Sequence, residues 1–273
     1  MKTRYFATAC IAALSSSVNA QYPSLTAMEN DQEITLYVQY PNWASATTSG
    51  SSFSYNYNNR MYLSTSPTLD PQSFYKPNLL GGSMEYDVDL SQVSCGCVSA
   101  LYTVLMPAAD NNVQDPFKYC DANQVGGHWC PEFDIQEANR HAFHATAHEC
   151  DAPSSNGVYH NCDRGGECTA DIYYEAANTY GFGSQYTINT ERPFHVKVDF
   201  QETDEVFTGY RMTFTQEGRE VVMDPQTGNC SAYLPAMTSD ITQMVFAMSH
   251  WTGGDLSWMQ HDLCSGGCQQ NAT

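Results

Sequence analysis

Short segments in which polar and apolar residues alternate recur along most of the chain, and they restrict its fold more than any other feature. In residues 84–90, Met-Glu-Tyr-Asp-Val-Asp-Leu, every second residue is apolar. Successive side chains of a strand point to opposite faces, so this pattern predicts a strand with one face in the core. Further strands are predicted at residues 33–40, 53–57, 61–64, 100–106, 130–139, 194–200, 209–215, 220–223 and 242–251.

These strands are short and separated by turn residues, which is typical of an all-β sandwich or jelly roll. Helical periodicity is nearly absent, although residues 138–148 or 170–178 could hold a turn or two of helix. The chain shows no internal repeat, and its 273 residues suit one large domain, which we place at residues 21–273.

The first twenty residues predict a secretory signal peptide. Lys2 and Arg4 precede an apolar run over residues 6–14, and cleavage is expected after Ala20. The run is shorter than the ~18 apolar residues that a membrane helix needs, and no later segment reaches that length. We therefore expect a secreted, extracellular protein with no membrane partner.

The cysteine count agrees with export. Eleven cysteines become ten once Cys10 leaves with the signal, and an even count in an exported chain predicts five disulfides. A zinc site is an alternative, because the spacing of four residues is typical of zinc ligands: His148, Cys150, His160 and Cys162. An oxidising compartment disfavours that alternative, so no metal is expected.

The charge balance excludes one class of partner. The chain has 30 Asp and Glu against 11 Lys and Arg, a net charge of −19. Nucleic-acid binding needs a basic surface, so we expect no nucleic-acid partner. A neutral polysaccharide is not repelled, and the 18 Tyr, 12 Phe and 4 Trp supply rings on which sugars can stack.

One stretch, residues 130–139 (Cys-Pro-Glu-Phe-Asp-Ile-Gln-Glu-Ala-Asn), places three carboxylates within six residues. In a strand, Glu132 and Asp134 share one face, whereas strict alternation would turn Glu137 to the other. One extra residue, a β-bulge, would bring Glu137 to the acidic face and leave the apolar residues facing the core.

Paired carboxylates are what glycoside hydrolysis requires, one as nucleophile or base and the other as proton donor. A third acid between them makes it costly to ionise all three, which keeps a proton in the cluster near neutral pH. The alternative is a solvated acidic face, because an acidic chain produces such patterns through composition alone.

Seven segments, in order, resemble those of one known family. Residues 131–139 (PEFDIQEAN) resemble its S-E-M-D-I-W-E-A-N, and residues 146–150 (TAHEC) its T-P-H-P-C. The others are residues 59–63, 79–95, 100–102, 119–122 and 247–251. The chain therefore resembles glycoside hydrolase family 7, the secreted cellobiohydrolases and endo-β-1,4-glucanases.

The resemblance implies a concanavalin-like jelly-roll sandwich of two antiparallel sheets with a concave substrate cleft. It implies that Glu132 is the nucleophile of a retaining mechanism, that Glu137 is the general acid/base, and that Asp134 hydrogen-bonds Glu132. The substrate-binding residues implied are Arg60, Tyr102, Tyr119, Asp121, His148, Trp251 and Trp258.

The resemblance also implies the disulfide pairing. It pairs Cys120 with Cys130, Cys150 with Cys162, and Cys168 with Cys230. The remaining partners are joined in an order that stays open, Cys95 and Cys97 with Cys264 and Cys268.

The function implied is that of a secreted, monomeric, retaining endo-β-1,4-glucanase that hydrolyses cellulose or a related β-glucan without a cofactor. The family's loops over the cleft are shortened in this chain, which favours an open groove and internal cutting. Two alternatives stay open: a β-1,3- or mixed-linkage glucanase, and a catalytically inactive sugar-binding protein of the same fold. Asn229 and Asn271 begin N-glycosylation sequons, which predicts a glycoprotein.

Overall fold

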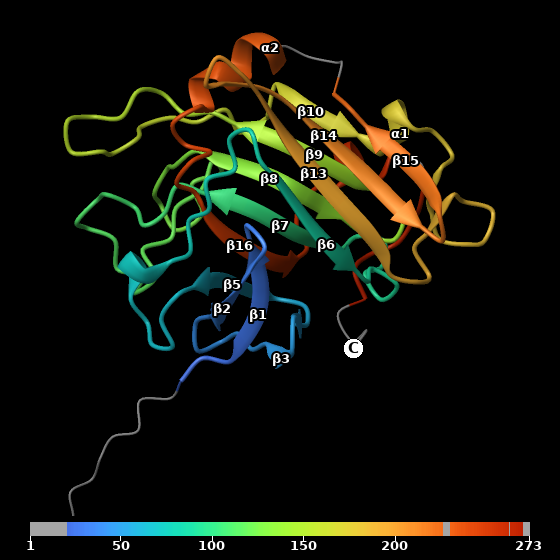
Figure 1. Cartoon of the computed structure of the whole chain (residues 1–273), viewed down its shortest axis with the longest axis horizontal. Helices are drawn as coiled ribbons and strands as arrows, with labels where there is room; N and C mark the ends of the chain where they lie inside the picture. Colours follow the sequence, from blue (N-terminus) through green and yellow to red (C-terminus); the bar gives the residue numbers. More distant parts are fainter. Residues whose placement is uncertain (1–20, 226–229, 262, 270–273) are drawn as a thin grey trace, which may run out of the picture.

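The computed structural model describes residues 21–225, 230–261 and 263–269, and within them two antiparallel sheets pack face to face (Figure 1). This arrangement confirms the predicted all-β sandwich. The predicted signal peptide, residues 1–20, lies outside the described residues, as do Asn229 and Asn271 of the predicted glycosylation sites.

The larger sheet has eight strands in the order β1-β2-β5-β16-β7-β8-β9-β10. Their bounds are β1 Ser24–Glu29, β2 Gln32–Gln39, β5 Asn59–Ser64, β7 Val98–Val104, β8 Glu132–Ala138, β9 Phe143–His148, β10 Cys168–Asp171 and β16 Val245–Trp251.

The smaller sheet, which we call the outer sheet, has four strands in the order β15-β14-β13-β6. Their bounds are β6 Ser83–Val88, β13 Phe194–Thr203, β14 Val206–Gln216 and β15 Arg219–Met223. From Phe194 to Phe200 every second residue of β13 is buried, so one face packs on the core and the other meets solvent.

The remaining elements are small. They are the hairpin β3 Thr47–Ser49 and β4 Ser52–Ser54, the parallel pair β11 Tyr180–Gly181 and β12 Ile188–Asn189, the helices α1 Ile172–Glu175, α2 Cys230–Tyr233 and α3 Ser257–Gln260, and the 3-10 turns η1 Pro71–Ser73 and η2 Leu234–Met237.

The core between the sheets is rich in aromatic rings. Phe133 of β8 lies 4.9 Å from the Tyr210 ring and 5.7 Å from the Phe200 ring of the outer sheet, centroid to centroid. Phe143 of β9 lies 4.8 Å from Phe214 in a T-shaped contact. Because Phe133 is fully buried, its two sequence neighbours must point to the opposite face of the large sheet.

Most strands lie where the alternation predicts them, and the differences fall at the margins. The helical turn expected in residues 138–148 is wrong, because residues 143–148 form β9. The turn expected in residues 170–178 is confirmed by α1. The strands that were not predicted are β1, β9 and β10 of the large sheet and the short strands β3, β11 and β12.

Five disulfides staple the sandwich, and they include the three pairs that the resemblance implies. The open order is resolved as Cys95–Cys264 and Cys97–Cys268, which tie the segment after α3 to the loop before β7. The zinc alternative at residues 148–162 is wrong, because Cys150 and Cys162 are bonded to each other. In the part of the chain that the structure describes, we find no helix with the length and hydropathy of a membrane span.

Candidate active site

A β-bulge in β8 forms the centre of the site. Opposite β9, Asp134 pairs with Thr146 and Glu137 with His144, so two residues of β8 face the single residue Ala145. The register against β7 shifts at the same point. The predicted bulge is therefore present, and it turns Glu137 to the face that carries Glu132 and Asp134.

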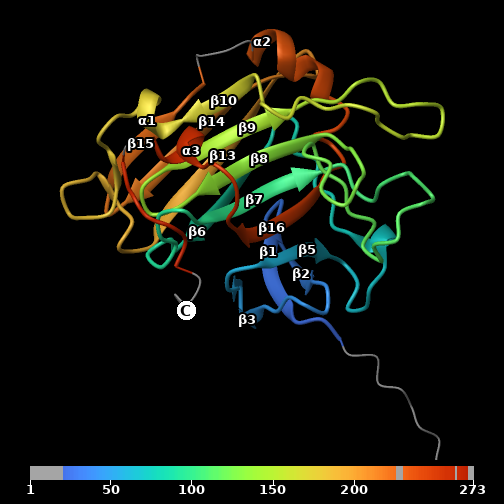
Figure 2. The same ribbon diagram turned by 180° about the vertical axis from the view of Figure 1, so that it is seen from behind.

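The three carboxylates line one cavity of about 1350 Å³ on the face of the large sheet opposite the core. Glu132 and Asp134 are each 5% exposed, whereas Glu137 is partly exposed. Figure 2 shows this face from the side opposite the outer sheet, with α3 near β9 and β10.

His148 and Asp134 form a buried ion pair in this cavity. His148 Nε2 lies 3.0 Å from Asp134 Oδ2, and Nδ1 lies 2.7 Å from the carbonyl oxygen of Asp163. Burial lowers the pKa of His148, but the hydrogen bond to Asp134 and its charge outweigh burial and raise that pKa to about 9. His148 is therefore positively charged at neutral pH and offsets the charge of Asp134.

Glu132 accepts a hydrogen bond of 2.9 Å from the backbone N–H of Ala122. Ala122 belongs to the loop that the Cys120–Cys130 disulfide closes, so this disulfide helps to position the Ala122 N–H. Burial and then the charge of Asp134 raise the pKa of Glu132 well above its usual range, whereas the Ala122 N–H stabilises the ionised form.

Burial, followed by the charge of Asp134, raises the pKa of Glu137 to about 8, although the positive charge of His148 opposes the rise. At neutral pH this carboxyl group is therefore mostly protonated, and its partial exposure lets it exchange protons with water. Two carboxyl groups, those of Glu132 and Glu137, thus face the same cavity.

A second group of residues lines the cavity beside Glu132. The Arg60 guanidinium carbon lies 3.4 Å from the centre of the Tyr119 ring, a cation–π contact. The hydroxyls of Tyr102 and Tyr119 are 3.0 Å apart. Asp121 accepts hydrogen bonds from the backbone N–H groups of Asn123 and Val125, at 3.0 and 2.8 Å.

The structure brings every sequence-predicted site residue to this one cavity, because Arg60, Tyr102, Tyr119, Asp121, His148, Trp251 and Trp258 all line it together with the three acids. Trp258 is 42% exposed. Gln136, by contrast, turns away from the cavity and accepts a hydrogen bond of 3.2 Å from the Tyr86 hydroxyl.

Sequence reasoning missed much of the lining of this cavity, including one tryptophan and three ionisable side chains. Trp43, which is 54% exposed, follows β2 and lines the cavity. The only feature of the sequence that could have pointed to it is a single tryptophan in a polar loop. The other three are His144, Asp171 and His261. His144 was overlooked because residues 138–148 were considered for a helical turn, whereas a strand would have placed His144 and His148 on one face.

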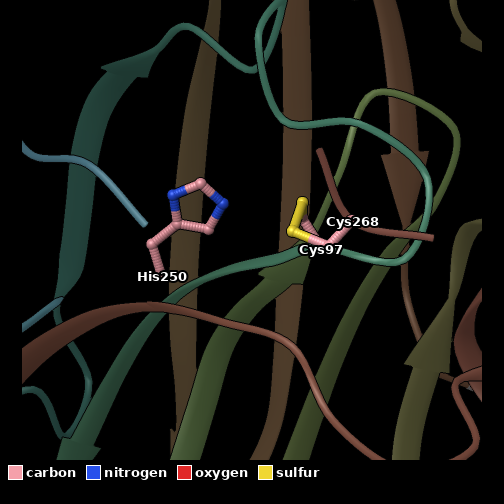
Figure 3. A group of neighbouring side chains, drawn as sticks. All are labelled: Cys97, His250 and Cys268. Carbon is pink, nitrogen blue, oxygen red and sulfur yellow. A yellow bond between two sulfur atoms is a disulfide. The ribbon is translucent and has the colours of Figure 1, made fainter. Parts of the chain in front are cut away.

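One neighbouring cluster is not a metal centre. The potential ligand atoms of Cys97, His250 and Cys268 lie within 4.8 Å of one another (Figure 3). Both sulfurs belong to the Cys97–Cys268 disulfide, which leaves no thiolate to bind an ion.

Much of the chain is similar to known proteins. The family model described as "Glycosyl hydrolase family 7" matches residues 109–255. A probable endo-beta-1,4-glucanase celB of Aspergillus clavatus is 29% identical over 181 residues, which cover 56% of this chain and 43% of that protein. The chain spans about half the length of the curated relatives it matches, 43% and 59% of the first two.

Solved structures share the jelly-roll fold. The Humicola insolens endocellulase EGI matches with a TM-score of 0.64 and 24% identity, over 78% of this chain and 68% of that one. A cellobiohydrolase of this family from Daphnia pulex matches with a TM-score of 0.67 and 18% identity, over 87% and 84%. Because the family model covers more than half of the sequence, the chain belongs to glycosyl hydrolase family 7.

Proposed function

We propose that the protein is a retaining glycoside hydrolase that cuts β-1,4-linked glucan, cellulose or a related polymer, at internal positions. The observation that carries the proposal is the bulge of β8, which brings Glu137 to the same cavity as Glu132. Membership of the family and relatives described as endo-β-1,4-glucanases support the substrate class.

In the first step, the Glu132 carboxylate attacks the anomeric carbon while Glu137 gives its proton to the glycosidic oxygen. The bond between that carbon and oxygen breaks, the shortened chain leaves as an alcohol, and a glycosyl ester forms on Glu132. The pKa of Glu137, about 8, supports its role as the acid at neutral pH.

In the second step, Glu137, now ionised, takes a proton from water as the water oxygen attacks the anomeric carbon. The ester bond breaks and Glu132 regains its charge, so the sugar keeps its original configuration. The hydrogen bond from the Ala122 N–H stabilises the ionised form of Glu132, and the positive charge of His148 offsets part of the charge of Asp134.

Substrate contacts divide between rings and polar groups. Trp251, Trp258 and Trp43 line the cavity and offer apolar faces to the glucose rings. Arg60 and Asp121 offer a donor and an acceptor for sugar hydroxyls. Internal cutting is proposed because the loops that the family carries over its cleft are shortened here. We further propose that the protein acts as a secreted monomer after loss of residues 1–20.

The test is a panel of soluble glucans that differ in linkage: carboxymethyl cellulose, lichenan and laminarin. We expect reducing sugar from the first two, a rapid fall in viscosity of carboxymethyl cellulose, and neither effect with Glu132→Gln. Release from laminarin alone would contradict the β-1,4 assignment. Binding of the glucans with no release from any of them would contradict hydrolysis.

A further inference from the structure

A second cluster of chemically capable side chains lies on the cleft face, outside the carboxylate group that the proposed mechanism uses. Two imidazoles and one carboxylate meet there: His144 of β9, Asp171 at the end of β10, and His261 after α3. His144 Nε2 lies 3.3 Å from Asp171 Oδ1, and His261 Nε2 lies 2.7 Å from Asp171 Oδ2.

The geometry points to a binding site for one divalent transition-metal ion of the zinc class, and we propose that these three side chains are its protein ligands. Imidazole nitrogen and carboxylate oxygen bind zinc at about 2.0–2.2 Å, so two ligand atoms of one tetrahedral ion are about 3.3 Å apart. One potential ligand atom from each side chain lies within 4.8 Å of the others, which requires only small side-chain rotations.

Neighbouring groups hold the three ligands in place, as a metal site needs. The backbone N–H of Tyr173 donates a hydrogen bond of 2.9 Å to Asp171 Oδ1. The Tyr173 ring stacks on His261 at 4.3 Å, and the Trp258 ring meets His144 edge-on at 5.3 Å. Because the ligands come from three separate segments, the fold rather than any local motif forms the site.

The local charge also suits a cation. Glu175 lines the same cavity, and its Oε1 is buried with no hydrogen-bond partner among the described residues. Asp171 and Glu175 interact electrostatically, so two carboxylates act on this region. All ten cysteines of residues 21–273 are in disulfides, so no thiolate competes for the ion.

The site lies in register with the proposed acid/base. Glu137 pairs with His144, and His144 pairs with Asp171, so the three side chains form a row across neighbouring strands on one face. Asp171 is thus two strands, about 10 Å, from Glu137. An ion bound there would lie in the cleft on the same side as Glu137 and would obstruct the sugar chain. This consequence, unlike zinc binding itself, rests on the proposed function.

Zinc binding is tested without substrate, by titrating ZnCl₂ into the metal-free, untagged protein in a calorimeter. We expect one ion per chain. Because loss of an outer-shell partner alone weakens metal sites about 10–100-fold, removal of a ligand in His261→Gln or Asp171→Asn should weaken binding at least about 100-fold. Circular dichroism and the melting temperature check that both variants fold.

The matched control is His195→Gln. His195 lies on the exposed face of the outer sheet between Asp87 and Glu85, at 3.1 and 3.5 Å, and thus combines one imidazole with two carboxylates. We expect it to leave zinc binding unchanged. No binding by the wild type, or equal binding by folded His261→Gln, would overturn the proposal. The second readout is glucan cleavage, which we expect zinc to inhibit in the wild type but not in His261→Gln. If the protein is not a hydrolase, this second readout is lost, whereas the calorimetric test of zinc binding still applies.

Discussion

The two sheets share one core but differ in what covers their second face. In β13 buried and partly exposed residues alternate from Phe194 to Phe200, and the outward residues meet solvent. In β9 all six residues are buried, because loops and α3 cover the face that looks away from the core. His144, for example, contacts Trp258 and the Met259 carbonyl of α3.

This difference shows how to recognise the site. On the solvent face of β13 a charged side chain such as Lys197 needs no protein partner, and its pair with Asp199 is a surface pair. On the covered face of β8 and β9 a charge is costly unless it is paired, as Asp134 is with His148. A buried and paired charge in the cleft sheet therefore marks a candidate functional site.

The largest effect should come from a single cleft carboxylate. Glu132→Gln keeps an acceptor for the Ala122 N–H but cannot attack carbon, so we expect kcat on carboxymethyl cellulose to fall at least about 10³-fold. Its melting temperature should not fall, because the buried charge of Glu132 costs folding free energy. A large loss of stability, measured by calorimetry, would contradict this account.

The next residue along β8 should behave in the opposite way. Phe133→Ala removes a ring that packs against the outer sheet, so we expect the free energy of unfolding in urea to fall by about 3–5 kcal/mol. Phe133→Leu is the control and should lose less. An unchanged midpoint for Phe133→Ala would show that the two sheets are not coupled through this ring.

The ion pair should matter for rate more than for folding. Asp134→Asn removes the partner that keeps His148 charged, so the pKa of His148 should fall, and we expect kcat to drop about 10–100-fold. One like charge is also lost beside Glu137, so the alkaline limb of the pH–rate profile should move to lower pH. A shift in the opposite direction would contradict the assigned contacts.

The pH dependence of the wild type follows from Glu137, whose pKa is raised to about 8. As the proton donor it is active when protonated, so kcat/KM should fall as pH rises through about 8, about tenfold per unit above it. The folded state holds this proton more tightly than the unfolded state, so its contribution to stability declines from about pH 4.5 to 8. Glu137→Gln should flatten that decline in melting temperature.

The smallest effect should come from the outer sheet. Asp199→Asn breaks the exposed pair with Lys197, 2.7 Å apart, and we expect almost no change in melting temperature and less than about twofold in kcat. Because it removes a strand carboxylate just as Asp134→Asn does, it is the matched control for the cleft. If Asp199→Asn lost as much activity as Asp134→Asn, the proposed difference between the two sheets would be wrong.

Much of this contrast could be predicted from sequence. In residues 84–90 and 194–200, the alternation of apolar and polar residues indicates a strand with one face in the core and the other in solvent. The positions of β6 and β13 agree with this prediction. The spacing of Glu132, Asp134 and Glu137 required a bulge if all three were to meet, and the bulge is present. Residues 143–148 also alternate apolar and polar side chains, Phe-His-Ala-Thr-Ala-His, so the sequence carries the pattern of β9 and the helical turn expected there is the error.

What the residue order determined, then, was local: which segments are strands, which face each side chain takes, and that three acids meet on one of them. The tertiary structure decided what depends on distant segments. It joined Cys95 to Cys264 and brought His261 to His144 and Asp171, across separations that no local pattern spans. The physical reason is that alternation reflects the pleat of one strand, whereas contacts between distant segments depend on how the whole chain packs.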